Sequence, residues 1–196
     1  MHRPLVLLAL ALAVPRLAPA STWELDPAHT AVQFAVRHLM VSTVRGRFTK
    51  VQGTATVDEQ DPTKSSVTAT VDTASIDTSN EKRDSHLKSP DFFDVAKYPT
   101  MTFVSKKVAA AGDGRWKVTG DLTLHGVTKE VVLDVEGSAK PMHDPMGNVK
   151  LGGVATTTIK RSDFGVSWNK SLEAGGVVVG DDVQVTIDVE LSKKGS

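Results

Sequence analysis

The chain has 196 residues, 23 basic and 23 acidic side chains, and no cysteine. This length fits one domain, and the balanced charge argues against a nucleic-acid partner because phosphate binding needs a basic surface. The lack of cysteine excludes a disulfide scaffold, a cysteine-based zinc site and a thiol nucleophile.

The first twenty residues have the pattern of a secretory signal peptide. A short positive start at residues 2–3 precedes the apolar run from Leu5 to Val14, and residues 18–20 (Ala-Pro-Ala) place small side chains where a signal peptidase reads. The apolar run has about ten residues, whereas a membrane-spanning helix needs about 20. We therefore expect cleavage after Ala20, secretion, and a single domain over residues 21–196.

The remaining chain has the composition of a β protein, with 25 Val and 20 Thr but only nine Leu and seven Glu. Val and Thr fit a pleated surface, while Leu and Glu favour helices. Apolar and polar residues alternate one by one, with a period of two, which predicts strands with one dry and one wet face. Eight segments show this alternation, and it is nearly perfect in residues 116–125 and 182–192. It is shorter in residues 32–36, 67–71, 101–103 and 131–135, and weaker in residues 46–57 and 149–162.

Short connectors predict that neighbouring strands are antiparallel. Residues 112–114 (Gly-Asp-Gly) and 125–126 (His-Gly) tolerate positive φ and suit hairpins, and residues 144–148 form a longer turn. Parallel strands would need much longer crossovers. Eight antiparallel strands most economically form a closed barrel, because closure removes exposed edges. Such a barrel is either filled by side chains or holds one small ligand, and the abundance of Val, Ala and Gly favours a partly empty, aliphatic interior.

One connector, residues 77–99, carries helix signals instead of alternation. Thr78 and Glu81 fit a capping box that opens a short helix to about Lys88. Ser89-Pro90 fits the start of a second helical turn. We expect this helical insertion between the third and fourth strands to plug or gate one end of the barrel, since long loops in compact domains are often functional.

An outer-membrane barrel is an alternative that the sequence disfavours. Such barrels need lipid-facing apolar residues and aromatic girdles. The chain has only ten aromatic residues, and the outward positions of its best strands include Lys117, Asp121 and Asp188.

Metal, nucleotide and catalytic motifs are weak or absent. The five histidines after the leader show neither a His-x-His pair nor helical spacing, and there is no Gly-x-Ser-x-Gly elbow or glycine-rich nucleotide loop. We expect no metal, no cofactor and no enzyme activity. Arg161 and Asp163 are predicted to pair and to stabilise a turn before Phe164.

Nine short strings, taken in order, carry a family resemblance. They are His29-Thr30 before Phe34 and His38-Leu39, Gly46-Arg47-Phe48, Ser75-Ile76-Asp77-Thr78, Arg83-Asp84-Ser85-His86-Leu87, Asp91-Phe92-Phe93, Tyr98-Pro99-Thr100-Met101-Thr102-Phe103, residues 120–128, Arg161-Ser162-Asp163-Phe164-Gly165 and Val179-Gly180-Asp181-Asp182-Val183. Together they resemble the YceI-like family of bacterial periplasmic proteins. The resemblance implies a periplasmic, lipocalin-like barrel that binds a polyisoprenoid or similar long-chain amphiphile, and some members are described as homodimers.

A non-catalytic carrier, storage or sensing protein follows from this resemblance and the expected aliphatic interior. The predicted cavity lining is Val32, Phe34, Val36, Val71, Phe103, Trp116, Leu122, Leu124, Leu133, Val185 and Ile187, with Phe92 and Phe93 closing one end. His38, Arg83 and His86 are the candidates for contact with a polar headgroup. Two alternatives stay open: a lipid-modifying enzyme of isoprenoid metabolism, and a ligand-free stress-response module that binds other proteins.

Overall fold

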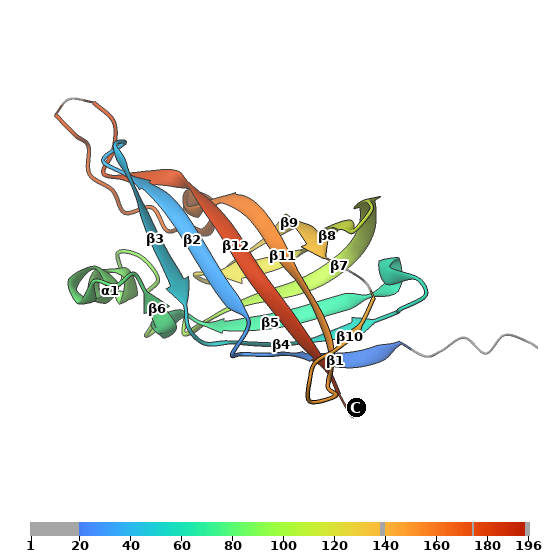
Figure 1. The fold of residues 1–196 in the computed structure, drawn as a ribbon. Helices are drawn as coiled ribbons and strands as arrows, with labels where there is room; N and C mark the ends of the chain where they lie inside the picture. The colour runs from blue at the N-terminus through green and yellow to red at the C-terminus, as the bar shows by residue number, and fades with distance from the viewer. Residues whose placement is uncertain (1–19, 138–139, 174, 195–196) are drawn as a thin grey trace, which may run out of the picture.

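The computed structural model describes residues 20–137, 140–173 and 175–194, so the predicted signal peptide, apart from Ala20, lies outside the described residues. In this part of the chain strands dominate, and no helix is both long and apolar enough to cross a membrane. The strands and the one α-helix (Figure 1) are β1 Ser21–Leu25, β2 Ala31–His38, β3 Ser42–Phe48, β4 Val51–Val57, β5 Ser66–Asp72, β6 Ile76–Asp77, α1 Glu81–Lys88, β7 Thr100–Gly112, β8 Arg115–Leu124, β9 Val127–Gly137, β10 Met142–His143, β11 Val149–Lys160 and β12 Val179–Lys193.

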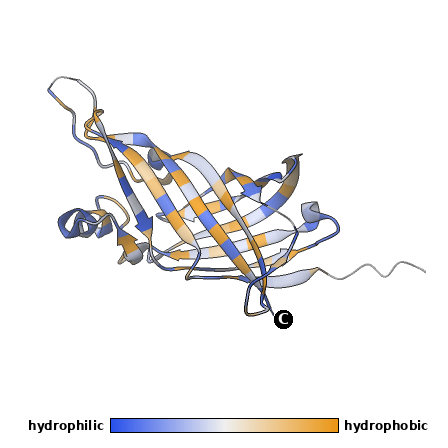
Figure 2. Cartoon of the chain, viewed as in Figure 1, coloured by the Kyte–Doolittle hydropathy of each residue, from blue (hydrophilic) through white to orange (hydrophobic). Residues whose placement is uncertain are grey.

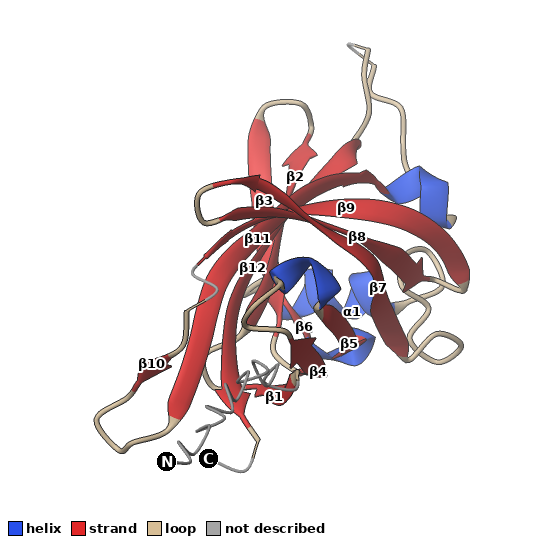
Figure 3. Ribbon diagram, turned by 90° about the vertical axis from the view of Figure 1, so that its right-hand side faces the viewer, coloured by secondary structure: helices blue, strands red, loops and turns tan. Residues whose placement is uncertain are grey.

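Antiparallel pairing closes these strands into the predicted eight-stranded barrel. Around the ring, β12 pairs with β1, then β4, β5, β7, β8, β9 and β11 follow, and β11 returns to β12. Figures 1 and 3 show the strands curving around one another to form this wall. The 15-residue β12 is the longest strand. One of its two edges pairs first with β2 and then, farther along, with β1.

The wall differs from the sequence prediction in two places. The segment 46–57 is not one strand, because β3 and β4 are separated at Thr49-Lys50. There the backbone N–H groups donate to Ser75, from Thr49 to its carbonyl and from Lys50 to its hydroxyl, instead of to a neighbouring strand. Strand β1 was also missed, since Ser21–Leu25 offers only five residues of alternation.

The predicted helical insertion is confirmed, with a different start. Helix α1 lies between the third and fourth strands of the wall and ends at Lys88, as expected. Its N-cap is Asn80, whose side chain accepts a hydrogen bond from the Arg83 N–H, so the prediction of Thr78 as the cap is wrong. The hydroxyl of Thr78 instead donates to the Asp84 carboxylate.

The predicted second helical turn at Ser89-Pro90 is also wrong, because residues 89–97 form turns. These turns fold back on α1 through backbone hydrogen bonds, among them Phe93 N–H to the Leu87 carbonyl. The predicted hairpins do form. Gly112 and Gly114 join β7 to β8, and His125 and Gly126 join β8 to β9 with φ of 52° and 74°.

Hydrophobic and hydrophilic residues alternate along the strands (Figure 2), and the residues that line the interior are mostly apolar. Two buried clusters lie toward the two ends of the barrel. We name them by the elements nearby. The α1-end cluster contains Phe48, Val51, Val71, Ile76, Met101, Leu124 and Phe164. The β1-end cluster contains Trp23, Ala55, Val57 and Leu151.

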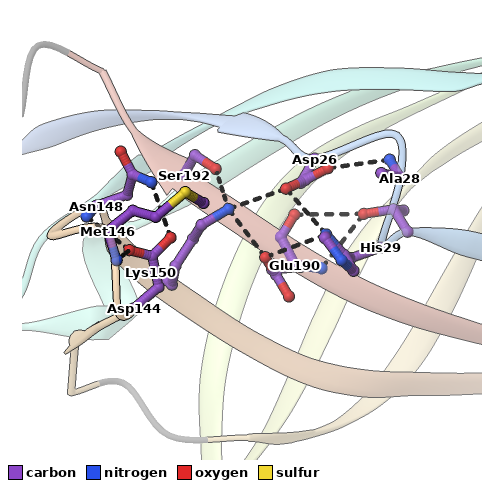
Figure 4. Close-up of polar contacts among 10 residues, drawn as sticks. Asp26, Ala28, His29, Asp144, Met146, Asn148, Lys150, Glu190 and Ser192 are labelled. Atoms are coloured by element: carbon purple, nitrogen blue, oxygen red, sulfur yellow. Dashed lines mark hydrogen bonds and ion pairs between the residues drawn. The ribbon is translucent and has the colours of Figure 1, made fainter.

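An ionic network ties three strands together where β1 bends toward β2 (Figure 4). The Lys150 ammonium on β11 lies 2.9 Å from both the Asp26 carboxylate and the Glu190 carboxylate on β12. His29 Nδ1 lies 3.1 Å from Asp26. The Lys150 hydrogen bond holds the pKa of Asp26 well below its ordinary value, and the bond to Asp26 raises the pKa of Lys150 to about 12.

This network predicts a stability that falls at both pH extremes. Because the folded pKa of Asp26 lies below 3.8, its contribution is complete above about pH 4 and is lost as the pH falls further. Because the folded pKa of Lys150 lies above 10.5, its contribution is complete below about pH 10 and is lost as the pH rises through about 12.

Urea unfolding at a series of pH values measures this dependence. Asp26→Asn should lower the free energy of unfolding near neutral pH and flatten its fall below about pH 4. Asp134→Asn is the matched control, because the Asp134 pair with Lys117 is exposed (62% and 55%) and exposed pairs contribute little. Equal effects of the two substitutions would contradict the role of the network.

Candidate apolar cavity

The barrel encloses a cavity of about 430 Å³. Its wall is built from the inward-facing residues of the ring, because side chains alternate between the two faces of a strand. Polar side chains in the wall are few: Gln33, Ser65, Ser66, Thr102, Thr157 and Arg161. A volume of this size falls in the range of small-molecule sites, which are about 300–1,000 Å³.

The structure places all thirteen predicted apolar residues in the cavity wall. They are Val32, Phe34, Val36, Val71, Phe92, Phe93, Phe103, Trp116, Leu122, Leu124, Leu133, Val185 and Ile187. The wall has further apolar residues that the sequence analysis left out, among them Leu25, Phe48, Val118, Val135, Ala155 and Ile159. Most of these could have been found by extending the same alternation along the full length of each strand.

The α1 end is covered by two segments that meet through aromatic rings. Phe92 follows α1, and its ring centroid lies 5.2 Å from that of Trp168, which follows β11. The ring of His86 contacts both, at 5.0 Å and 4.9 Å. Because Leu87, Phe92, Phe93 and Val166 also line the cavity, these two segments form its cover.

None of the three predicted headgroup contacts lies in the cavity wall. Arg83 donates to the hydroxyl and the carbonyl of Thr78. His86 pairs with the Asp91 carboxylate at 2.8 Å and packs in the aromatic cover. His38 ends β2 opposite Ser42. Arg83 and His86 therefore organise the segment that covers the cavity.

Arg161 is the one charged residue of the described cavity wall, and the predicted pair with Asp163 does not form. The guanidinium donates to the carbonyls of Val166, Trp168, Val179 and Gly180. Its side chain is 7% exposed, and burial lowers its pKa. Sequence spacing alone could not show these partners, because Val166 and Trp168 lie in the segment that follows β11, whereas Val179 and Gly180 begin β12 at the far end of that segment. Arg161 therefore holds these two ends together beneath the cover.

A histidine and two carboxylates lie close enough to suggest a cation site, but a cation of the chain already neutralises them. The trio is Asp26, His29 and Glu190, with ligand atoms within 4.8 Å of one another. The Lys150 ammonium contacts both carboxylates (Figure 4). This cluster lies apart from the cavity wall, and we assign it to barrel closure.

Inward-facing glycines determine where the large wall side chains lie. Phe34 on β2 is opposite Gly46 on β3, and a Cβ at Gly46 would lie 2.5 Å from Cζ of the Phe34 ring. Phe103 crosses Gly120 in the same way. Each ring therefore lies flat over a neighbouring strand, and this arrangement leaves the middle of the barrel open.

Gly46→Ala should push the Phe34 ring off the wall. The added Cβ would also meet Cγ2 of Thr78 at 2.7 Å, so both side chains must move. Overpacking of this kind costs about 1–3 kcal/mol, which urea unfolding can measure. In a Phe34→Leu background, which lacks the clashing ring atoms, the cost of Gly46→Ala should be smaller. An unchanged cost would contradict the assignment of the clash to Phe34.

Comparisons with known proteins agree with this architecture. A family model described as the YceI-like domain matches residues 23–191. A UPF0312 protein of Staphylococcus aureus is 38% identical over 172 residues, covering 88% of this chain and 98% of the relative. Another from Vibrio parahaemolyticus is 41% identical over 161 residues, covering 81% of this chain and 85% of the relative.

Solved structures show the same fold. Burkholderia cenocepacia BcnA matches with a TM-score of 0.72 and 27% identity, covering 85% of this chain and 98% of that one. A Campylobacter jejuni YceI protein matches with a TM-score of 0.69 and 34% identity, covering 81% and 90%. A polyisoprenoid-binding domain from Saccharophagus degradans matches with a TM-score of 0.63, 18% identity, and coverage of 87% and 98%. The chain belongs to the YceI-like family.

Proposed function

We propose that this protein is a non-catalytic binding protein that holds a polyisoprenoid or similar long-chain amphiphilic lipid in its barrel. One observation carries the proposal: the cavity of about 430 Å³ has an almost entirely apolar wall. A cavity of this kind stays dry and takes up apolar guests. The Saccharophagus degradans domain, described as polyisoprenoid-binding, has the same fold at 18% identity. The choice of an apolar ligand therefore rests on the cavity of this chain.

The energetics favour a chain-like apolar ligand. Burial of one methylene is worth about 0.8 kcal/mol, so ten methylenes give about 8 kcal/mol before the costs of association. For ten methylenes alone that gross figure sets the limit at a dissociation constant of about 1 µM, and the costs of association weaken it from there. A branched or linear hydrocarbon tail could therefore supply most of the affinity without a strong polar contact.

The chemistry of the wall argues against catalysis on a bound lipid. General acid–base catalysis needs a titratable group within hydrogen-bond reach of the reacting atom. The described wall contains no Asp, Glu, His, Lys or Tyr, and its Arg161 is already bonded to four carbonyls. A ligand-free module is disfavoured by the cavity, since well-packed interiors have few voids larger than a water molecule.

A matched pair of substitutions on β9 tests the proposal. Leu133 points into the cavity, whereas its neighbour Val132 is 41% exposed on the outer surface. Leu133→Trp should fill the cavity, and Val132→Trp should leave it open. Protein purified from its native host would be examined by native mass spectrometry and by organic extraction.

We expect a lipid adduct on the wild type and on Val132→Trp, and a reduction of at least about tenfold on Leu133→Trp, which corresponds to about 1.4 kcal/mol. Circular dichroism and thermal unfolding would show whether both variants fold. A wild-type protein without an adduct, or a folded Leu133→Trp that retains it, would contradict lipid binding in the barrel.

Secretion to the periplasm after Ala20 belongs to the same proposal. Strand β1 begins at Ser21, and the Trp23 ring N–H donates to the Ser21 hydroxyl, so removal of residues 1–20 would leave every described strand intact. Mass spectrometry of the periplasmic fraction should find Ser21 at the N-terminus. Full-length protein confined to the cytoplasm would contradict this part.

A further inference from the structure

The turn between β2 and β3 exposes three consecutive apolar side chains, which we call the apolar tip. They are Leu39, Met40 and Val41, exposed by 40%, 43% and 77%. The turn lies at the upper left of Figure 1, at the same end of the barrel as α1, and the described part of the segment before β12 projects farther out beside it. Its Leu39 N–H donates to the Val178 carbonyl in the segment before β12.

The backbone of the tip makes this composition unusual. The Val41 N–H donates to the His38 carbonyl, and φ is 50° at Leu39 and 60° at Met40. Two positive φ values in this position define a turn that favours Asn-Gly or Asp-Gly, both small and polar. The chain instead has Leu39 and Met40 there. Positive φ is unfavourable for these residue types, and their exposure to water is unfavourable as well.

Basic side chains lie just behind the tip. Arg37 and Arg45 are exposed and occupy the outward face of the β2–β3 hairpin. The Arg37 guanidinium donates to the Met40 carbonyl and the Thr43 hydroxyl and so braces the turn. Lys170 is exposed in the segment before β12, and Glu173 is the one acidic side chain among its described residues 165–173 and 175–178.

We propose that the apolar tip inserts into the surface of an anionic lipid bilayer, with Arg37 and Arg45 against the headgroups. A narrow convex tip offers a protein partner little area, whereas a fluid bilayer can enclose it. Apolar side chains backed by cations match the order of acyl chains and anionic headgroups in a membrane surface. The protein would then lie on the membrane through this one end.

The apolar tip lies close to the cavity wall and to a strand edge left unpaired in the described part of the chain, which links contact with a bilayer to lipid uptake. Phe34 and Val36 of β2 line the cavity two to four residues before the strand ends at His38. In the described residues, β6 pairs with β3 only at Arg47 and Phe48, so no strand covers the outer edge of Ser42–Gly46. A docked tip would place this uncovered edge beside the lipids. This role in lipid uptake rests on the proposed function, but the contact with the bilayer does not.

Vesicle sedimentation tests the contact, using the folded protein without its leader and vesicles of phosphatidylethanolamine and phosphatidylglycerol in equal parts. Val41→Asp should reduce the bound fraction by at least about tenfold, because a charge would have to enter the apolar region. Arg45→Gln should weaken binding about fivefold, the effect of about 1 kcal/mol per basic residue near an anionic surface. Val132→Asp, on the outer wall of β9, is the matched control and should bind as the wild type does.

A fluorescent reporter adds a direct readout of insertion. Val41→Trp should bind at least as well as the wild type and shift its emission to the blue with these vesicles, since Trp favours the membrane interface. Vesicles of phosphatidylcholine alone should bind both forms weakly.

Two outcomes would overturn the inference: wild-type protein that stays in the supernatant, or Val41→Asp that sediments as the wild type does. Leu133→Trp separates this inference from the proposed function. If the cavity binds no lipid but the tip docks, wild type and Leu133→Trp both sediment and neither carries an adduct. If the tip does not dock but the cavity binds lipid, the adduct persists without sedimentation. Specific capture of a protein by the tip, in place of vesicles, would count against the bilayer as its partner.

Discussion

Strand β12 is the constraint on which the rest of this molecule depends. One edge pairs with β11 along Lys150–Lys160, and the other pairs with β2 and then β1. With no cysteine in the chain, these ladders and the packing beneath them must close the wall. The ionic network of Asp26, Lys150 and Glu190 lies where β1, β11 and β12 meet. Closure therefore combines backbone pairing along β12 with the ion pairs of Lys150 near the C-terminal end of that strand.

Closure fixes the direction of every wall side chain, and the sizes of those side chains then determine the interior. The wall contains Val, Ala and Gly at many inward positions, and the rings of Phe34 and Phe103 lie over glycines. Filled clusters occur toward the two ends, so the open space remains between them. Barrels of eight strands can fill their interior completely. This barrel does not, because small residues occupy inward positions where larger ones would meet in the middle.

Period-2 alternation predicts the barrel and eleven of the thirteen predicted cavity residues, because a closed sheet turns one face of every alternating strand inward. The signals that failed were local ones. Thr78 and Glu81 have the spacing of a capping box, but Asn80 takes the cap and Thr78 bonds Asp84. Asn80 directly precedes the helix and can cap it, whereas the Thr78 hydroxyl is already bonded to Asp84 and is not available as the cap. The break between β3 and β4 depends on Ser75, a residue 25 positions away that no short window includes.

The polar residues were the hardest to place, and the reason is physical. The chemistry of Arg83 and His86 and their place on the insertion suggest a headgroup site, yet their partners are Thr78, Asp91 and the aromatic cover. The cation that does reach the wall, Arg161, has its charge distributed over four backbone carbonyls. A buried cation in this arrangement costs less than an unpaired one, but it has little capacity left to attract an anion. The interior therefore selects by shape and apolar area, and the charged residues able to meet an anionic partner lie outside it, behind the apolar tip.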